Sequence, residues 1–295
     1  MWIAGFLSAI CFSLMGLVVA HFGVGISASE FLLGRSVFGL IFLSPLLLLS
    51  KSKNQISPLL ILRGVIGTLA IIILFIMIQN VGPATANAIH YTSPLYVTLL
   101  SALFLKDKIN FQKAGALLLV MMGVLLPLTS KMSIIDPSFL LLGILGAALS
   151  GISFFLLKLV TLDISEVAIY WMFCIVQLAV QIPLDLLSNN PVFHIRFYLL
   201  FSSLGFPCLV VGLLACAAQL LMNNSFKKLS ASTASLLNLL SIPITVIIEF
   251  FVFDQRYANS QYLMILLILA GILLLRINAK DAKNSFQKLL PGLTT

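Results

Sequence analysis

The chain has 295 residues, of which 61% are hydrophobic and only 9% are charged, and its mean hydropathy is +1.15. Because a soluble domain carries roughly 25% charged residues, this composition excludes a water-soluble enzyme. Lys and Arg number 17 against 9 Asp and Glu, a net charge of +8, which in so apolar a chain indicates loops facing anionic membrane lipids and no nucleic-acid partner.

Apolar runs separated by short polar breaks predict ten transmembrane helices, since a spanning helix needs about 20 apolar residues. The predicted helices cover residues 2–22, 29–49, 58–79, 84–105, 112–129, 138–160, 166–187, 197–222, 231–253 and 259–277. Ten such helices leave no room for a separate soluble domain. The predicted fold class is an all-α membrane protein.

The basic residues predict an orientation, because Lys and Arg are retained on the cytoplasmic side of a membrane. With the N-terminus inside, thirteen of them lie on the cytoplasmic side: Lys51, Lys53, Arg63, Lys106, Lys108, Lys113, Lys158, Lys227, Lys228, Arg276, Lys280, Lys283 and Lys288. The opposite side has three: Lys131, Arg196 and Arg256. We therefore expect a multi-pass protein of the cell membrane with both termini in the cytoplasm.

An internal repeat is the most informative feature of the sequence. Three landmarks recur at separations of 149, 147 and 148 residues: Pro94 and Pro243, Asp107 and Asp254, Gly123 and Gly271. Four earlier landmarks recur 136 to 138 residues apart: Gly5 and Gly143, Ala9 and Ala147, Glu30 and Glu166, Pro45 and Pro183. The chain therefore divides into a five-helix repeat over residues 1–130, a second over residues 131–277 and a short basic cytoplasmic tail over residues 278–295. Because five is odd, the second repeat is predicted to be inverted in the membrane.

This pattern resembles the drug/metabolite transporter superfamily and its EamA-like ten-helix carriers. The resemblance lies in residues 80–86 (NVGPATA), residues 93–95 (SPL) and Asp107, with an echo in residues 231–243 and Asp254. Members of the family usually have Glu at the two Asp positions. The resemblance covers residues 1–277 and implies a secondary transporter that needs no cofactor.

Leu62-Arg63-Gly64, with Glu30 and Arg35 before it, resembles the branch that contains S-adenosylmethionine carriers of intracellular bacteria. The first hypothesis is therefore uptake or exchange of S-adenosylmethionine across the bacterial inner membrane. Export of amino acids, other metabolites or toxic compounds is the alternative. A non-transporting intramembrane binding or scaffold protein and an intramembrane transferase represent other classes, and a homodimer is considered as an assembly.

Two ionisable residues fall inside predicted spans, where a charge usually faces a partner or a substrate pathway. Arg35 is a candidate donor to a substrate carboxylate, or a structural partner of Glu30, or a side chain that reaches the membrane interface. Glu249 could neutralise a cationic substrate or exchange a proton, or it could reach the interface because it lies near the end of its span.

The remaining candidates cluster around the two repeated prolines. Pro94 and Pro243 free the carbonyls four residues earlier, those of His90 and Leu239, and broken helices at corresponding places point to a binding site. His90, Tyr91 and Asn238 are therefore candidate substrate-binding residues, with a structural hydrogen bond as the other interpretation of His90.

Trp171, beside Tyr170, could form an aromatic wall or belong to an interfacial aromatic belt. Gln177, Gln181, Gln219 and Asn223 either line a pathway or join helices, and Lys158 is predicted to anchor the interface. The sequence contains no phosphate-binding loop, no metal-ligand spacing and no catalytic motif.

Overall fold

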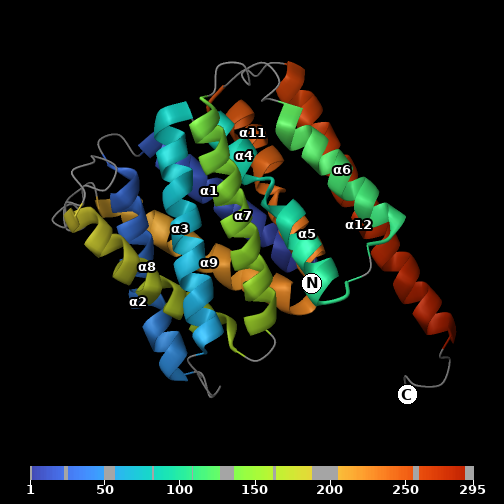
Figure 1. The fold of residues 1–295 in the computed structure, drawn as a ribbon, viewed down its shortest axis with the longest axis horizontal. Coiled ribbons are helices and arrows are strands. Elements are labelled where there is room, and N and C mark those ends of the chain that lie inside the picture. Colours follow the sequence, from blue (N-terminus) through green and yellow to red (C-terminus); the bar gives the residue numbers. More distant parts are fainter. Residues whose placement is uncertain are drawn as a thin grey trace.

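The computed structural model describes residues 2–22, 26–49, 57–81, 83–107, 109–126, 136–161, 164–187, 205–254 and 259–289, and the regular structure in these ranges is helical. The helices are α1 (Trp2–Phe22), α2 (Ala28–Leu49), α3 (Pro58–Val81), α4 (Pro83–His90), α5 (Ser93–Phe104), α6 (Phe111–Leu125), α7 (Pro137–Val160), α8 (Glu166–Leu187), α9 (Gly205–Lys228), α10 (Ala231–Asn238), α11 (Ser241–Val252) and α12 (Asn259–Leu289) (Figure 1). Side chains beyond Leu275 lie outside the described residues, as do Lys51, Lys53, Lys108, Lys131, Arg196 and Arg256.

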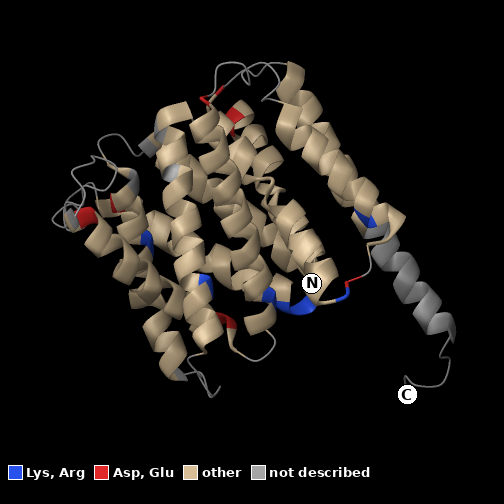
Figure 2. Ribbon diagram, in the orientation of Figure 1, with Lys and Arg blue, Asp and Glu red and all other residues tan. Residues whose placement is uncertain are grey.

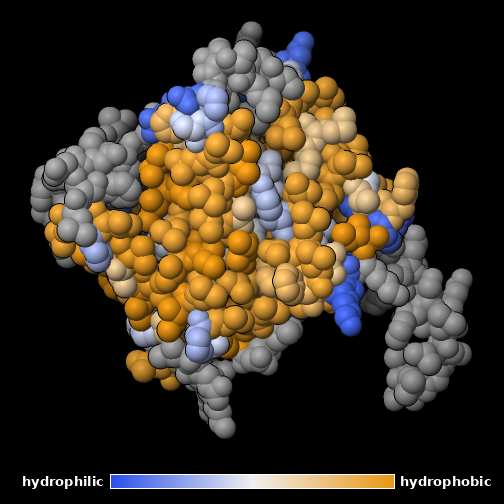
Figure 3. All heavy atoms as spheres, in the orientation of Figure 1, coloured by the Kyte–Doolittle hydropathy of each residue, from blue (hydrophilic) through white to orange (hydrophobic). Residues whose placement is uncertain are grey.

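Seven stretches are long and apolar enough to cross a membrane. They lie in α1, α2, α3, α7, α8, α9 and the continuous stretch formed by α10 and α11, whereas α6 and the first part of α12 are shorter apolar helices. The visible surface is apolar over most of its area (Figure 3). Large apolar side chains are exposed, among them Leu48 and Leu103, which are 87% and 74% exposed. Such a surface is stable against lipid and not against water, so the protein is a multi-pass membrane protein.

The fourth and ninth predicted spans are each broken in two, close to their prolines. α4 ends at His90 and α5 begins at Ser93, while α10 ends at Asn238 and α11 begins at Ser241. The short helices have 8 residues in both cases and the longer ones 12. The prediction of a discontinuous helix at both places is confirmed, because a proline removes the donor that would continue the helix.

Two predicted helix ends are wrong. The eighth span was expected to end at residue 222, but α9 continues to Lys228 because the polar residues near its end pack against other helices inside the protein. Asn223 is buried and its amide nitrogen donates to the Glu166 carbonyl at 3.1 Å. The last span was expected to end at residue 277, but α12 continues to Leu289 through residues rich in the helix formers Ala, Lys and Gln.

The helices pack as interlocked pairs. α3 lies on α7 and α1 on α9, while α2 contacts both α8 and α9. α6 and α12 lie side by side at one edge of the bundle, opposite α2 and α8 (Figure 1). The contact of α1 with α9 and the contact of α7 with α3 are equivalent if α1 corresponds to α7 and α3 to α9. In both contacts the first long helix of one half of the chain packs on the third long helix of the other half.

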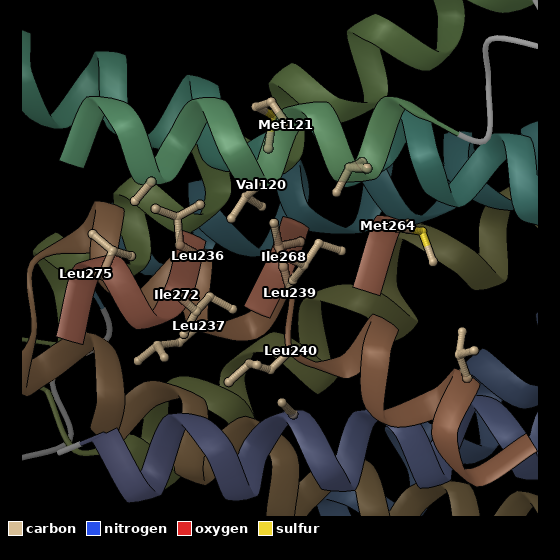
Figure 4. Close-up of a cluster of buried hydrophobic side chains, with 14 residues drawn as sticks. Val120, Met121, Leu236, Leu237, Leu239, Leu240, Met264, Ile268, Ile272 and Leu275 are labelled. Atoms are coloured by element: carbon tan, nitrogen blue, oxygen red, sulfur yellow. The ribbon is translucent and has the colours of Figure 1, made fainter. Parts of the chain in front are cut away.

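The edge pair α6 and α12 joins the bundle through a cluster of aliphatic side chains. Val120 and Met121 of α6 and Ile268 and Ile272 of α12 belong to this cluster, and the broken segment of α10 and α11 adds four leucines, Leu236, Leu237, Leu239 and Leu240 (Figure 4). Gly271 lets the two helices approach, since a Cβ there would lie 2.8 Å from the Ala116 carbonyl oxygen. The cluster therefore holds the second helix break against a packed wall.

Candidate substrate-binding site

The two helix breaks meet inside the bundle. The Tyr91 side chain, in the first break, packs against the cluster that contains Leu239 and Leu240 of the second break, and its hydroxyl interacts with Ser241, the first residue after that break. Ser13 of α1 donates to the Ser241 carbonyl at 2.8 Å. Residues that the sequence places 150 positions apart are thus in contact, and the contact joins α1 to both broken segments.

The two breaks differ in the hydrogen bonding of their backbone carbonyl groups. Pro94 has no N–H, so the His90 carbonyl has no helical donor. The expectation that Leu239 presents a free carbonyl in the same way is wrong, because the Ile242 N–H donates to it at 3.1 Å. At the second break, a hydrogen bond between residues three apart, as in a 3₁₀-helix, therefore replaces the missing α-helical hydrogen bond.

The side chains at the breaks also differ. The His90 Nε2 lies 3.1 Å from the Ser150 hydroxyl of α7, so the structural interpretation of His90 describes an actual contact. Asn238 stands at the corresponding position of the second break, and its Oδ1 is buried without a hydrogen-bond partner. Because a buried polar atom without a partner is costly, Asn238 offers an acceptor for a ligand.

Arg35 lies within the bundle, 8% exposed. Its Nε donates to the hydroxyl of Tyr170 at 3.3 Å, and its guanidinium carbon lies 5.9 Å from the ring centroids of Tyr170 and Phe173. Glu30, its predicted alternative partner, forms a capping box at the start of α2, where its Oε2 accepts from the Ser27 N–H at 2.7 Å and its own N–H donates to the Ser27 hydroxyl at 3.2 Å.

Arg63 was not among the predicted site residues, although it was counted among the cytoplasmic basic residues and belongs to the Leu62-Arg63-Gly64 motif. The structure buries Arg63 in α3, 2% exposed, with its guanidinium carbon 5.0 Å from the Phe173 ring centroid. Its Nε and Nη1 are buried without a hydrogen-bond partner. The available signal was its position inside the predicted third span, the same criterion that singled out Arg35.

The two arginines form one cationic cluster around Phe173, and basic positions within α2 and α3 are visible in Figure 2. Their guanidinium carbons are separated by no more than the sum of their distances to the ring, about 11 Å. Within the described ranges neither arginine has a carboxylate partner. Burying an arginine in a bilayer costs about 2.5–3.5 kcal/mol on insertion scales. The two guanidinium groups contact the neutral side chains of Tyr170 and Phe173, and these contacts do not neutralise the positive charge of the cluster.

The arginine cluster adjoins the helix breaks through α7. Ser153 donates to the Arg63 carbonyl at 3.2 Å, and Ser150, one turn earlier, contacts His90. Gly67 holds Phe173 close to α3, since a Cβ at Gly67 would lie 2.9 Å from that ring. One turn of α7 therefore separates the contact with the Arg63 backbone from the contact with the first break.

Two further predicted site residues, Trp171 and Glu249, have polar partners of their own. The Trp171 indole N–H donates to the Ser44 hydroxyl at 3.1 Å, so its polar edge is engaged by α2. Glu249 lies about 12 Å along α11 from the break, at 1.5 Å per residue, and its Oε1 is 3.6 Å from His21 Nε2 of α1. The His21 ring stacks on Phe253 with centroids 3.7 Å apart, so Glu249 belongs to a cluster at the ends of α1 and α11.

A second polar cluster closes the opposite end of the broken segments. Asp107 accepts from Lys113 of α6 at 2.8 Å and from Ser232 of α10 at 3.3 Å. Lys158, predicted as an interface anchor, donates to the carbonyls of Phe226 and Leu229 at 2.7 and 2.8 Å and so caps α9. We call the contact of Asp107 with Lys113 and Ser232 the Asp107 latch.

Gln181 and Asn223, two of the neutral polar residues in the spans, join neighbouring helices. The Gln181 amide donates to the Ser29 carbonyl at 2.7 Å, and Asn223 contacts Glu166 as described above. The described residues hold no group of three His, Cys, Asp or Glu side chains that could bind a metal ion. The chemistry of the site is therefore that of two guanidinium groups, aromatic rings and amide or hydroxyl groups.

Comparison with known proteins agrees with this architecture. The sequence profile of the EamA-like transporter family matches residues 1–129 and 137–277. The pseudopaline exporter CntI of Pseudomonas aeruginosa is 32% identical over 124 residues, which are 41% of this chain and 43% of that protein. Solute carrier family 35 member G1 of Mus musculus is 31% identical over 125 residues, 41% of this chain and 33% of that protein.

The matched region thus spans less than half the length of these curated relatives. A crystal structure of a protein 15% identical in sequence superposes with a TM-score of 0.76, covering 95% of this chain and 97% of the other. At that identity the superposition shows a shared fold and nothing about the ligand.

Proposed function

Because this chain belongs to the EamA-like transporter family, we propose that it is a secondary carrier that moves a small polar metabolite across the bacterial inner membrane by alternating access. The observation that carries the proposal is the meeting of two broken helices, through Tyr91 and Ser241. Broken helices at corresponding places in two repeats are typical of transporter binding sites.

Ten spans in two inverted five-helix repeats are part of this proposal. The equal lengths of α4 and α10 and of α5 and α11 support it. So does a left-handed backbone at Lys106, with φ of 53°, and at Asp254, with φ of 49°, since these residues follow α5 and α11 at the same distance. In this arrangement α4 with α5, α6 and α12 supply the spans beyond the seven long stretches.

The proposed inversion also gives the carrier two ends that open in turn. α5 packs against α10 beside the Asp107 latch, whereas the corresponding pair α4 and α11 makes no comparable contact among the described residues. Two inverted repeats in identical conformations would make both contacts equally. The difference supports a state that is closed at the end with the Asp107 latch. The distribution of basic residues predicts that this end is cytoplasmic, and we propose that both termini lie on the same side.

The direction of transport we propose is export, on the ground that a relative 32% identical over 124 residues is named an exporter. Uptake of S-adenosylmethionine is a second candidate, supported by the resemblance of Leu62-Arg63-Gly64, with Glu30 and Arg35, to that branch. Its carboxylate would suit the buried arginines, and its sulfonium would have Tyr170 or Trp171 as an aromatic neighbour.

Transport by the purified full chain in proteoliposomes tests these proposals. Labelled S-adenosylmethionine, glutamate, phenylalanine and succinate are supplied in turn, with the same unlabelled solute preloaded inside. Uptake stimulated by the internal solute, and absent from empty liposomes, is the expected result for at least one solute. Flux under gradients imposed from either side then measures direction. If the protein is folded and inserted in the liposomes but transports no solute from a wider panel of metabolites, the proposal of a carrier is contradicted.

A further inference from the structure

We infer that Arg35 and Arg63, with Phe173 between their helices, form a binding site for a carboxylate of the transported metabolite, which is a small organic anion. The inference rests on the proposed carrier function and specifies the substrate class. The inference depends on three side chains that meet at one place: Arg35 of α2, Arg63 of α3 and Phe173 of α8.

The charge of the cluster is the first argument. Two guanidinium groups, on residues 8% and 2% exposed, lie around the Phe173 ring, and the ion pairs of the described residues do not involve either of them. Arginine stays protonated in proteins. A ligand that brings negative charge to this place therefore removes an imbalance that the protein leaves uncompensated.

The unused hydrogen-bond donors are the second argument. Arg63 keeps Nε and Nη1 buried without an acceptor, although buried donors in folded proteins almost always find a partner. Arg35 uses its Nε on Tyr170, and this bond turns its guanidinium toward Phe173. A guanidinium group binds a carboxylate through two parallel hydrogen bonds, either from Nε and Nη2 or from Nη1 and Nη2. Each of the two open donors of Arg63 therefore supplies one hydrogen bond of such a pair.

The walls of the site favour a carboxylate over a phosphate. The recorded neighbours of the guanidinium groups are the aromatic rings of Tyr170 and Phe173. A phosphate group has more oxygens to satisfy and is more strongly hydrated, so it needs further donors such as a helix N-terminus or a glycine-rich loop. The planar carboxylate needs only a guanidinium fork and lies comfortably beside a flat ring.

Binding measured in detergent tests the inference separately from transport. The purified full chain is titrated with succinate, glutamate and lactate, with succinamide as a neutral analogue and with inorganic phosphate, all at constant ionic strength. Thermal unfolding reports binding. We expect at least one carboxylate to raise the Tm of the wild-type protein, and succinamide and phosphate to leave it unchanged.

Substitutions then locate the site. Arg63→Gln and Arg35→Gln are expected to weaken the carboxylate Kd about tenfold or more, the effect of losing a charge-assisted pair. Arg63→Lys keeps the charge and loses the fork, so it should give a smaller but measurable loss and serves if the Gln variant does not fold. Lys228→Gln removes the same charge from the exposed end of α9 and should leave the Kd unchanged.

Each result has a definite meaning. A wild-type protein that no carboxylate stabilises, or that succinamide stabilises equally, overturns the inference, as does a carboxylate Kd that survives both Gln substitutions. Stabilisation by phosphate alone also overturns the choice of carboxylate. If carboxylates bind through the arginines but no solute crosses the liposome membrane, the site stands and the carrier proposal fails. If a neutral solute is transported and no carboxylate binds, the carrier stands and this inference fails.

Discussion

Arg35 and Arg63 are both buried in the bundle, but their guanidinium groups have different partners. Arg35 has a hydroxyl acceptor in Tyr170, whereas Arg63 lies against the face of Phe173 and has two nitrogens without an acceptor among the described residues. A buried donor that lacks a partner costs about 1–3 kcal/mol. At the residue scale, Tyr170 is therefore a stabilising partner and Arg63 is the group that gains most from a ligand.

This difference predicts the effect of removing the Tyr170 hydroxyl. Tyr170→Phe leaves the ring in place and removes the acceptor of Arg35 Nε, so the free energy of unfolding should fall by about 1–3 kcal/mol. The measurement is the Tm in detergent without ligand. Tyr262→Phe, at a position 40% exposed on α12, is the matched control and should leave the Tm unchanged. Equal Tm values for the two variants would contradict the stabilising role of Tyr170.

Individual helices owe their ends to different devices. α2 starts with the capping box of Ser27 and Glu30, α4 stops before Pro94, and α9 ends under the ammonium group of Lys158. The last of these is supplied by another helix, so the end of α9 depends on its packing against α7. A cation at the carbonyl end of a helix also interacts favourably with the helix dipole.

Removing the ammonium group should loosen the end of α9. Lys158→Met loses the bonds to the Phe226 and Leu229 carbonyls, worth about 1–2 kcal/mol together for a partly exposed group. Hydrogen exchange measured by mass spectrometry should become faster in residues 222–229. Lys228→Met, at an exposed position of the same helix end, should leave the exchange unchanged, and similar acceleration in both variants would argue against the cap.

Close approach of α6 and α12 depends on Gly271. A Cβ there would lie 2.7 Å from the Val120 Cγ2 and 2.8 Å from a backbone oxygen, so Gly271→Ala must push the helices apart at about 1–3 kcal/mol. Gly16 of α1 has nothing within 4 Å of the corresponding position. Gly16→Ala is therefore the control, and a lower Tm in the Gly271 variant alone is the expected result. Two variants of equal Tm would refute the close contact.

At the scale of the whole molecule, the two ends of the bundle are held by different contacts. The Asp107 latch connects α5, α6 and α10 at one end, and the His21–Glu249 pair lies at the ends of α1 and α11. For the proposed carrier, opening toward the cytoplasm must separate Asp107 from Ser232.

A cross-link at the Asp107 latch tests this requirement. Asp107→Cys with Ser232→Cys is made in a background where Cys11, Cys174, Cys208 and Cys216 are replaced by Ser. Oxidation should reduce transport to the level of empty liposomes, and dithiothreitol should restore it, because a disulfide holds α5 and α10 together. The Asp107→Cys single variant, oxidised in the same way, should be unaffected. Undiminished transport by fully cross-linked protein would show that this contact does not open.

Helix breaks and membrane class were accessible from the sequence because they depend on local properties. Mean hydropathy and run length identify apolar helices, and a proline interrupts a helix regardless of what surrounds it. The recurring landmarks also anticipated the correspondence of α4 and α5 with α10 and α11. Local rules failed at the end of α9, where Asn223 looks like a loop residue until Glu166 of α8 accepts its hydrogen bond.

The candidate site could be predicted only in part, and the reason lies in sequence separation. A charge inside a span marked Arg35, but the partner that orients it, Tyr170, is 135 positions away. Arg63 was counted as a cytoplasmic basic residue because nothing in its neighbourhood in the chain shows that Phe173 covers it. Which polar groups meet, and which stay without a partner, follows from the packing of helices distant in the chain, and that packing is a property of the tertiary structure alone.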